Sequence, residues 1–202
     1  MKKKSIAILA LLFCFLKPYA QFTTGLNLGL NFCTVKDGLS NDNSTLIGMN
    51  TGLFTQYSLD KKFFLNTGLQ YSSKGYNAKF ASQATTTNMI LNYISIPTLI
   101  GFSVTNNLAF LFGPEFNYLT SAKSKNDSNK SDITDDFKKL DIGLDLAIKS
   151  NFSKRFGVEL RYNYGLSKIQ NVTIYVNGQL FGSSTLGNNR VFQINLFYTF
   201  KK

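Results

Sequence analysis

The chain has 202 residues, enough for one domain of ordinary size, and is 14% aromatic but only 16% charged. With 15 Gly, 19 Phe and 10 Tyr against three Pro, this composition favours β-structure over a helical protein. The net charge of +11 comes from basic residues scattered along the chain, so we predict no nucleic-acid partner. The chain contains no His, which excludes a serine–histidine nucleophile.

The first twenty residues have the character of a secretory signal peptide. A basic start precedes the apolar run Ser5–Leu16, which is too short to cross a bilayer, and Ala20 offers a cleavage site. We therefore predict a signal peptide at residues 1–20 and a mature domain at 21–202. The alternative is a buried hydrophobic strand. After cleavage 18 basic and 11 acidic residues remain, a net charge of +7, and Cys33 cannot form an intramolecular disulfide.

The mature sequence consists of segments in which apolar and polar residues alternate, the period-two pattern of β-strands. We predict eight strands, at Phe22–Val35, Leu46–Tyr57, Phe63–Tyr76, Met89–Val104, Leu108–Ala122, Phe137–Lys149, Phe156–Ile169 and Arg190–Phe200.

The predicted connections alternate between short and long. The short ones are Ser58–Lys62, Thr105–Asn107 and Ser150–Arg155, and the long ones are Lys36–Thr45, Asn77–Asn88, Lys123–Asp136 and Gln170–Asn189. Short turns at one end and long loops at the other are typical of outer-membrane barrels, which have both termini on the periplasmic side. The predicted fold is all-β, an eight-stranded antiparallel up-and-down transmembrane β-barrel.

Two features indicate which face of the strands points outward. An eight-stranded barrel is barely wide enough for side chains to fill it, so its many Leu, Ile, Phe and Tyr residues fit better on a lipid-facing wall. The opposite face is rich in glycine, which suits a crowded lumen better than a solvated surface. These glycines are Gly25, Gly29, Gly48, Gly52, Gly68, Gly101, Gly113, Gly143, Gly157 and Gly165.

Aromatic residues recur at an interval of eight on the apolar face. The pairs are Phe63 and Tyr71, Phe110 and Tyr118, Phe156 and Tyr164, and Phe192 and Phe200. Eight residues of a tilted strand rise ~20 Å, close to the ~25 Å apolar band between the aromatic girdles of a membrane barrel. The alternative is that these rings pack the core of a soluble barrel.

Charged residues on the polar face predict a network inside the lumen. Its members are Glu115, Asp141, Asp145, Lys149, Glu159 and Arg161. Paired carboxylates such as Asp141 and Asp145 are capable of acid–base catalysis, but a neutralising network is the favoured interpretation because buried charges are tolerated when paired. We therefore predict no enzyme activity, no cofactor and no metal site, and a filled lumen.

The last long connection contains a hairpin signal. Two alternating segments, with Ile174 and Tyr175 in the first and Leu180 and Phe181 in the second, flank Asn177-Gly178, a pair typical of a type I′ turn. Such a hairpin extends the barrel above the membrane, and its exposed apolar residues make it a candidate for partner docking.

Several short motifs resemble the PorT-like outer-membrane β-barrel family of Bacteroidetes. They are Gly25–Asn31, Tyr93–Pro97, Gly113-Pro114, Asp141–Gly143 and Tyr164–Leu166, which together span most of the mature chain. Ser95 stands where that family usually has an acidic residue or Gln. The resemblance implies an outer-membrane barrel and little about activity, because most members have no assigned role.

From these observations we expect a structural or interaction module in the outer membrane that contacts lipid through its wall and, at its long loops, a protein or surface glycan. A small-molecule channel, a secretion-associated barrel and a soluble exported lipocalin-like binder are the alternatives.

Overall fold

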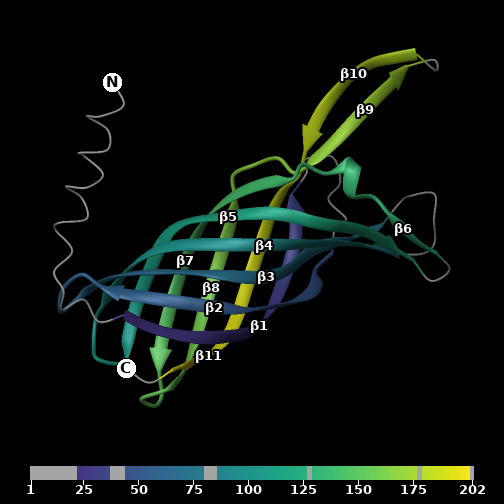
Figure 1. Cartoon of the computed structure of the whole chain (residues 1–202). Coiled ribbons are helices and arrows are strands. Elements are labelled where there is room, and N and C mark those ends of the chain that lie inside the picture. The colour runs from purple at the N-terminus through teal and green to yellow at the C-terminus, as the bar shows by residue number, and fades with distance from the viewer. Residues whose placement is uncertain (1–21, 37–43, 80–85, 127–128, 177–178, 201–202) are drawn as a thin grey trace, which may run out of the picture.

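The computed structural model describes residues 22–36, 44–79, 86–126, 129–176 and 179–200 (Figure 1). Within this part of the chain, no helix is long and apolar enough to cross a membrane. Eight strands form a barrel wall: β1 (Phe22–Lys36), β2 (Leu46–Ser58), β3 (Phe63–Lys79), β4 (Thr86–Ser103), β5 (Leu108–Lys125), β7 (Leu140–Asn151), β8 (Phe156–Gly165) and β11 (Asn188–Thr199). Beyond the wall lie β6 (Lys130–Asp132), the 3₁₀ turn η1 (Thr134–Asp136), β9 (Gln170–Val176) and β10 (Gln179–Leu186).

The wall is a closed antiparallel meander. Each wall strand pairs with the next one along the chain, and β1 closes the cylinder by pairing with β11 in a register that sets Leu28 opposite Leu196. The start of β1 and the end of β11 therefore lie at the same end of the barrel as the short turns. The predicted all-β, eight-stranded up-and-down fold is confirmed.

The three short turns share one hydrogen-bonding device. In each turn, a short polar side chain accepts hydrogen bonds from the backbone N–H groups two and three residues later in the chain. In the first turn, Asp60 Oδ1 accepts them from Lys62 and Phe63, at 2.6 and 2.7 Å. Thr105 and Ser153 repeat this pattern in the other two turns. Asp, Thr and Ser are turn formers for this reason, since their side chains satisfy backbone donors that no strand partner reaches.

The two faces of the wall differ as the alternation predicted. On β1, Leu26, Leu28 and Leu30 point outward and are exposed, whereas Asn27 and Asn31 point inward and are buried. This arrangement contradicts a soluble lipocalin-like barrel, whose apolar side chains would line the inside.

Aromatic rings gather on the outside near the short turns. Phe63 and Phe102 are 5.2 Å apart between ring centroids, and Phe156 and Tyr198 are 4.9 Å apart. All eight rings of the predicted pairs at an interval of eight are exposed on the outer face.

The strand ends at the long-loop end differ from prediction. β3 and β4 continue pairing as far as Lys79 and Thr86, across residues predicted to be loop. The sixth wall strand begins at Leu140 instead of Phe137, and the seventh ends at Gly165 instead of Ile169. Alternation cannot set these limits, because these strand ends have no single apolar face.

A second difference is an apolar cluster inside the barrel at the long-loop end. It is made of Val35, Tyr76, Ala78, Leu91, Tyr93, Leu119, Ala122, Phe137 and Ile169. Phe137 and Ile169, predicted as strand residues, instead reach this cluster from the connections on either side of β7 and β8. Their burial closes the lumen at this end with hydrocarbon.

Candidate functional site

The middle of the lumen holds a network of charged side chains. All six predicted residues lie there and are buried: Glu115 on β5, Asp141, Asp145 and Lys149 on β7, and Glu159 and Arg161 on β8. Alternate residues of three successive strands put them on one inner surface, and this brings their charges together.

Arg161 is the centre of the network. Its guanidinium binds Glu159 at 2.6 Å, Asp145 at 3.3 Å and Glu115 at 3.5 Å, with all four side chains nearly sealed from solvent. Arginine suits this position because its planar guanidinium offers five N–H donors and keeps its charge. The cation thus offsets carboxylates from three strands at once.

Lys74 on β3 is a network member that the sequence analysis missed. Its Nζ donates to Glu115 Oε1 at 2.8 Å and to Asn117 Oδ1 at 3.1 Å, and it is fully buried. The signal was available, because Lys74 continues the inward-facing positions of Gln70 and Ser72.

Asparagine amides complete the binding of the carboxylates. Asn189 donates to Asp141 at 2.8 Å, and Asn163 donates to Asp145 at 2.6 Å. Both aspartates have no exposed surface, so the pair considered for acid–base catalysis is enclosed by protein groups.

Lys149 sits at the short-turn side of the network and is held differently. Its ammonium lies over the rings of Phe54 and Phe197, at 4.3 and 4.4 Å from their centroids. Gln56 Oε1 accepts a hydrogen bond from it at 3.5 Å. Within the described residues Lys149 has no ion pair, although Glu159 is its direct partner across the strands.

Inward-facing phenylalanines close the lumen beside Lys149. The Phe64 ring lies over Gly101 of β4, and the Phe197 ring over Gly157 of β8. A Cβ at either glycine would overlap the ring, so a side chain there would force the aromatic out of place. These glycines are part of the predicted lumen set, and the structure shows what they make room for.

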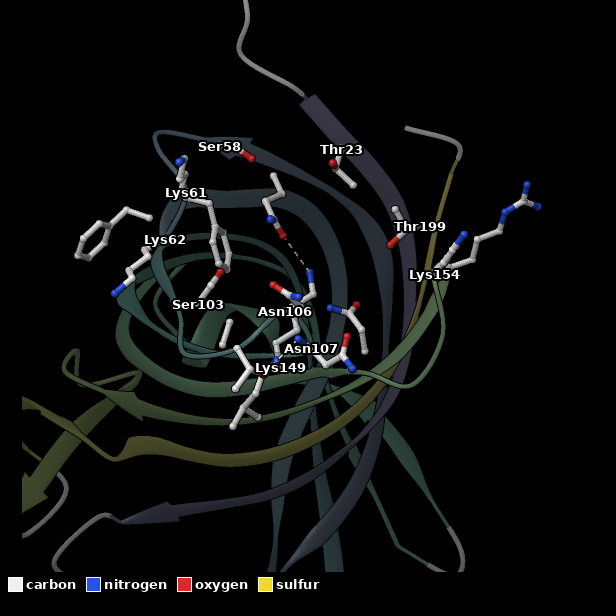
Figure 2. A pocket seen from close by; sticks show the side chains of 18 of the residues that line it. Thr23, Ser58, Lys61, Lys62, Ser103, Asn106, Asn107, Lys149, Lys154 and Thr199 are labelled. Atoms are coloured by element: carbon white, nitrogen blue, oxygen red, sulfur yellow. Dashed lines mark hydrogen bonds between the residues drawn. The ribbon is translucent and has the colours of Figure 1, made fainter.

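Below this floor the barrel opens into a vestibule of about 740 Å³ among the short turns (Figure 2). Lys149 lines both the vestibule and a cavity of about 10 Å³ on the inner side of the phenylalanines. The charged residues that line the vestibule are Asp60, Lys61, Lys62, Lys149, Lys154 and Arg155. Its lining is therefore strongly cationic.

The predicted docking hairpin is present as a separate two-stranded sheet. β9, with Ile174 and Tyr175, pairs with β10, with Leu180 and Phe181, and the register shifts between Leu180 and Gly182. Asn177 and Gly178 lie outside the described residues. Figure 1 shows this hairpin projecting beyond the barrel at the end opposite the short turns.

Residues 18–171 match a family described as "Outer membrane protein beta-barrel domain". The chain belongs to this family. Its barrel therefore resides in the lipid bilayer of an outer membrane, and the apolar wall is the surface that contacts lipid.

Solved structures show the same fold at low identity. Ail, the attachment invasion locus protein of Yersinia pestis, in complex with the heparin analogue sucrose octasulfate, is 14% identical, with 89% of this chain and 99% of that chain covered and a TM-score of 0.50. Neisserial surface protein A is 10% identical, with coverage of 88% and 97% and a TM-score of 0.54. No curated protein sequence matches the chain.

Proposed function

We propose that the protein is an interaction module of the outer membrane, with a closed lumen and with partner contacts at its long loops. The observation that carries this proposal is the filling of the lumen by the Arg161 network, between the apolar cluster and the phenylalanine floor. The proposal includes no catalysis: the buried aspartates are enclosed, and the sequence lacks His.

The filled interior argues against a small-molecule channel. An eight-stranded barrel is just wide enough for side chains to fill it. The cavity of about 10 Å³ behind the floor has room for no more than about one water molecule. A conducting path would require the salt bridges of Arg161 and Lys74 to separate.

The proposed orientation places the long loops outside the cell and both chain ends in the periplasm, after removal of residues 1–20 as a signal peptide. Residues 1–20 lie outside the described part of the chain. Short turns on the periplasmic side and longer extracellular loops are the rule for bacterial barrels.

The long-loop end offers features suited to a partner. The β9–β10 hairpin stands clear of the wall, and exposed cations lie at the same end of the barrel, at Lys125, Lys130, Lys138, Lys139 and Lys168. The Ail structure contains a sulfated heparin analogue. By this analogy a surface glycan bearing anionic groups, or a protein, is the proposed partner.

The narrower placement in the PorT-like branch is also a proposal. It is supported by the motif Tyr93–Pro97, in which Tyr93 and Ser95 face the lumen and Ser95 donates to Asn117 at 2.5 Å. A role in secretion does not follow from motifs that are part of the lumen packing.

Conductance across a planar bilayer tests the closed lumen. We expect the purified protein to insert without a stable conductance that scales with salt. A stable conductance of uniform size would support the channel alternative and contradict the proposal.

Binding to immobilised heparin tests the loop end, with heparin as a probe for anionic glycans. We expect salt-sensitive retention that weakens on removal of residues 171–186, or in the double variant Lys138→Gln/Lys139→Gln. The matched control is Lys138→Arg/Lys139→Arg, which keeps both positive charges at the same positions. Equal weakening by the control, or no weakening by either loop-end variant, would contradict the proposed glycan site.

A further inference from the structure

The vestibule at the short-turn end has the properties of a ligand site that the proposed function does not use. We propose that it binds a small organic phosphate, with the Lys149 ammonium as the charge at its floor. This inference concerns the end of the barrel opposite the loops, so it stands or falls separately from the glycan proposal.

The state of Lys149 is the first argument. Among the buried cations of the lumen, Arg161 binds a carboxylate at 2.6 Å and Lys74 binds one at 2.8 Å. Lys149 is 7% exposed and contacts the Gln56 amide oxygen, at 3.5 Å, and two aromatic faces, but it has no direct ion pair within the described residues. An ammonium group has three donors, and a buried charge without a counterion is unfavourable. An external anion would supply that counterion.

The position of Lys149 makes such an anion possible. Lys149 lines the vestibule, which opens toward the short turns, so a ligand reaches it without crossing the lumen (Figure 2). Glu159 attracts Lys149 from across the strands but makes no direct ion pair with it, because its carboxylate binds Arg161 and accepts a hydrogen bond from Asn195 at 3.2 Å.

The lining decides the charge of the ligand. Five basic residues and one acidic residue, Asp60, line the vestibule, although the Arg155 guanidinium donates to the hydroxyl of Tyr198 on the outer face. Lys61 and Lys154 stand at its rim on two different turns (Figure 2), whereas the Lys62 ammonium turns outward over the Phe102 ring of the outer wall. A volume of about 740 Å³ lies within the ~300–1,000 Å³ usual for small-molecule sites. The site therefore fits an anion with an organic body.

Phosphate is favoured over carboxylate by charge. A phosphate monoester carries about −1.5 to −2 at neutral pH and has three acceptor oxygens, so it engages the floor and the rim together. Lysine ammonium groups bind phosphate as mobile point charges. The same group could come from a soluble phosphate ester or from an anionic lipid headgroup at the rim, and the experiment separates these sources.

Calorimetric titration of the folded full-length protein in zwitterionic micelles, with glycerol 3-phosphate as the probe, tests the site. We expect saturable binding by the wild type. The key variant is Gln56→Glu, which places a carboxylate beside Lys149 and should weaken binding about tenfold or more by supplying an internal counterion. Asn106→Asp makes the same charge change at a vestibule residue that is not a hydrogen-bond partner of Lys149 within the described residues, and we expect a much smaller loss.

A second pair of variants removes one positive charge from either end of the barrel. Lys149→Met should abolish binding, whereas Lys138→Met at the opposite end should leave it unchanged. Retention of the heat-modifiable gel mobility of a folded barrel is checked for every variant. Should Lys149→Met fail to fold, Gln56→Glu still decides the matter.

Absence of saturable binding by the wild type would overturn the proposal, as would equal binding by Gln56→Glu and the wild type. Repeating the titration in nanodiscs with and without phosphatidic acid, a lipid whose headgroup is a phosphate monoester, then identifies the source. Competition by this lipid that is lost in Gln56→Glu indicates a headgroup, and binding unaffected by the lipid indicates a soluble ester; either supports a phosphate site.

Discussion

The outer wall and the lumen are built from alternate residues of the same strands, yet they obey opposite rules. On β8, Leu160 and Tyr162 point outward and are about 40% exposed, at 39% and 42%. Their neighbours Glu159, Arg161 and Asn163 point inward and are at most 6% exposed. In a water-soluble barrel the two sets would exchange places.

The difference shows that an unpaired charge is unfavourable on either face, for different physical reasons. On the wall a charge meets hydrocarbon and has no partner. In the lumen a charge is stable while its partners remain, and removing one partner leaves the others buried and uncompensated. Variants on the two faces separate these effects.

The largest effect is expected for Arg161→Leu. This change leaves Glu115, Asp145 and Glu159 without their shared cation, and breaking a buried pair costs about 3–5 kcal/mol. The measurement is the free energy of unfolding in urea, in detergent micelles. Arg190→Leu is the control, because Arg190 stacks on Tyr164 and has no ion pair within the described residues. Equal losses of unfolding free energy for the two variants would contradict a specific contribution of the buried network to stability.

A smaller effect is expected for Leu196→Arg on the outer wall. Leu196 is exposed in a strand whose outer face meets lipid, and an arginine near the bilayer midplane costs about 2–4 kcal/mol. Folding into vesicles followed by urea titration measures the loss. Leu59→Arg is the matched control at a short turn, where the cost falls to about 0–1 kcal/mol. Similar costs at both positions would place residue 196 outside the membrane.

A third variant, Gly101→Val, tests the packing of the phenylalanine floor. The new side chain overlaps the Phe64 ring, and overpacking of this kind costs about 1–3 kcal/mol. Thermal unfolding should show the loss, and the additional change Phe64→Ala should recover part of it. A double variant less stable than either single variant would contradict the packing relation between these residues.

The smallest effect is expected at a turn outside the membrane. The N–H groups of Phe63 and Lys62 donate to the Asp60 carboxylate and hold its pKa below the usual 3.8. A lowered pKa in the folded state gives a stabilisation that is present above the unfolded pKa and is lost as the pH falls through the folded pKa. Asp60→Asn should therefore be slightly less stable than the wild type at neutral pH, and this difference should shrink on acidification below about pH 4. A difference that grows on acidification would have the wrong sign.

The wall was predictable because one physical rule governs it. Period-two alternation places Leu26, Leu28 and Leu30 on one face, and the narrow barrel sends that face outward. The same alternation predicted that Asp141, Asp145 and Arg161 face the lumen. The membrane-crossing part of each strand could be predicted well for this reason.

The features that could not be predicted are those that the period-two alternation of apolar and polar residues does not govern. Phe64 and Phe197 face inward despite being aromatic, because Gly101 and Gly157 leave room for them across the strands, and that register is not visible in one sequence. The inward position of Lys74 could have been predicted from the alternation on β3, but its pairing with Glu115, which is distant in the chain, could not. Above the membrane, the continued pairing of β3 and β4 has no apolar face to indicate it.

The central claim is that apolar side chains face lipid while polar ones fill a sealed lumen. Spin labels on single cysteines at positions 195 and 196, in a Cys33→Ser background, test it directly by their collisions with oxygen, which is lipid-soluble, and with a water-soluble nickel chelate. We expect the label replacing Leu196 to be reached readily by oxygen and poorly by nickel, and the label replacing Asn195 to be reached poorly by both. A label at 196 that is sealed from oxygen, with one at 195 open to it, would contradict the account.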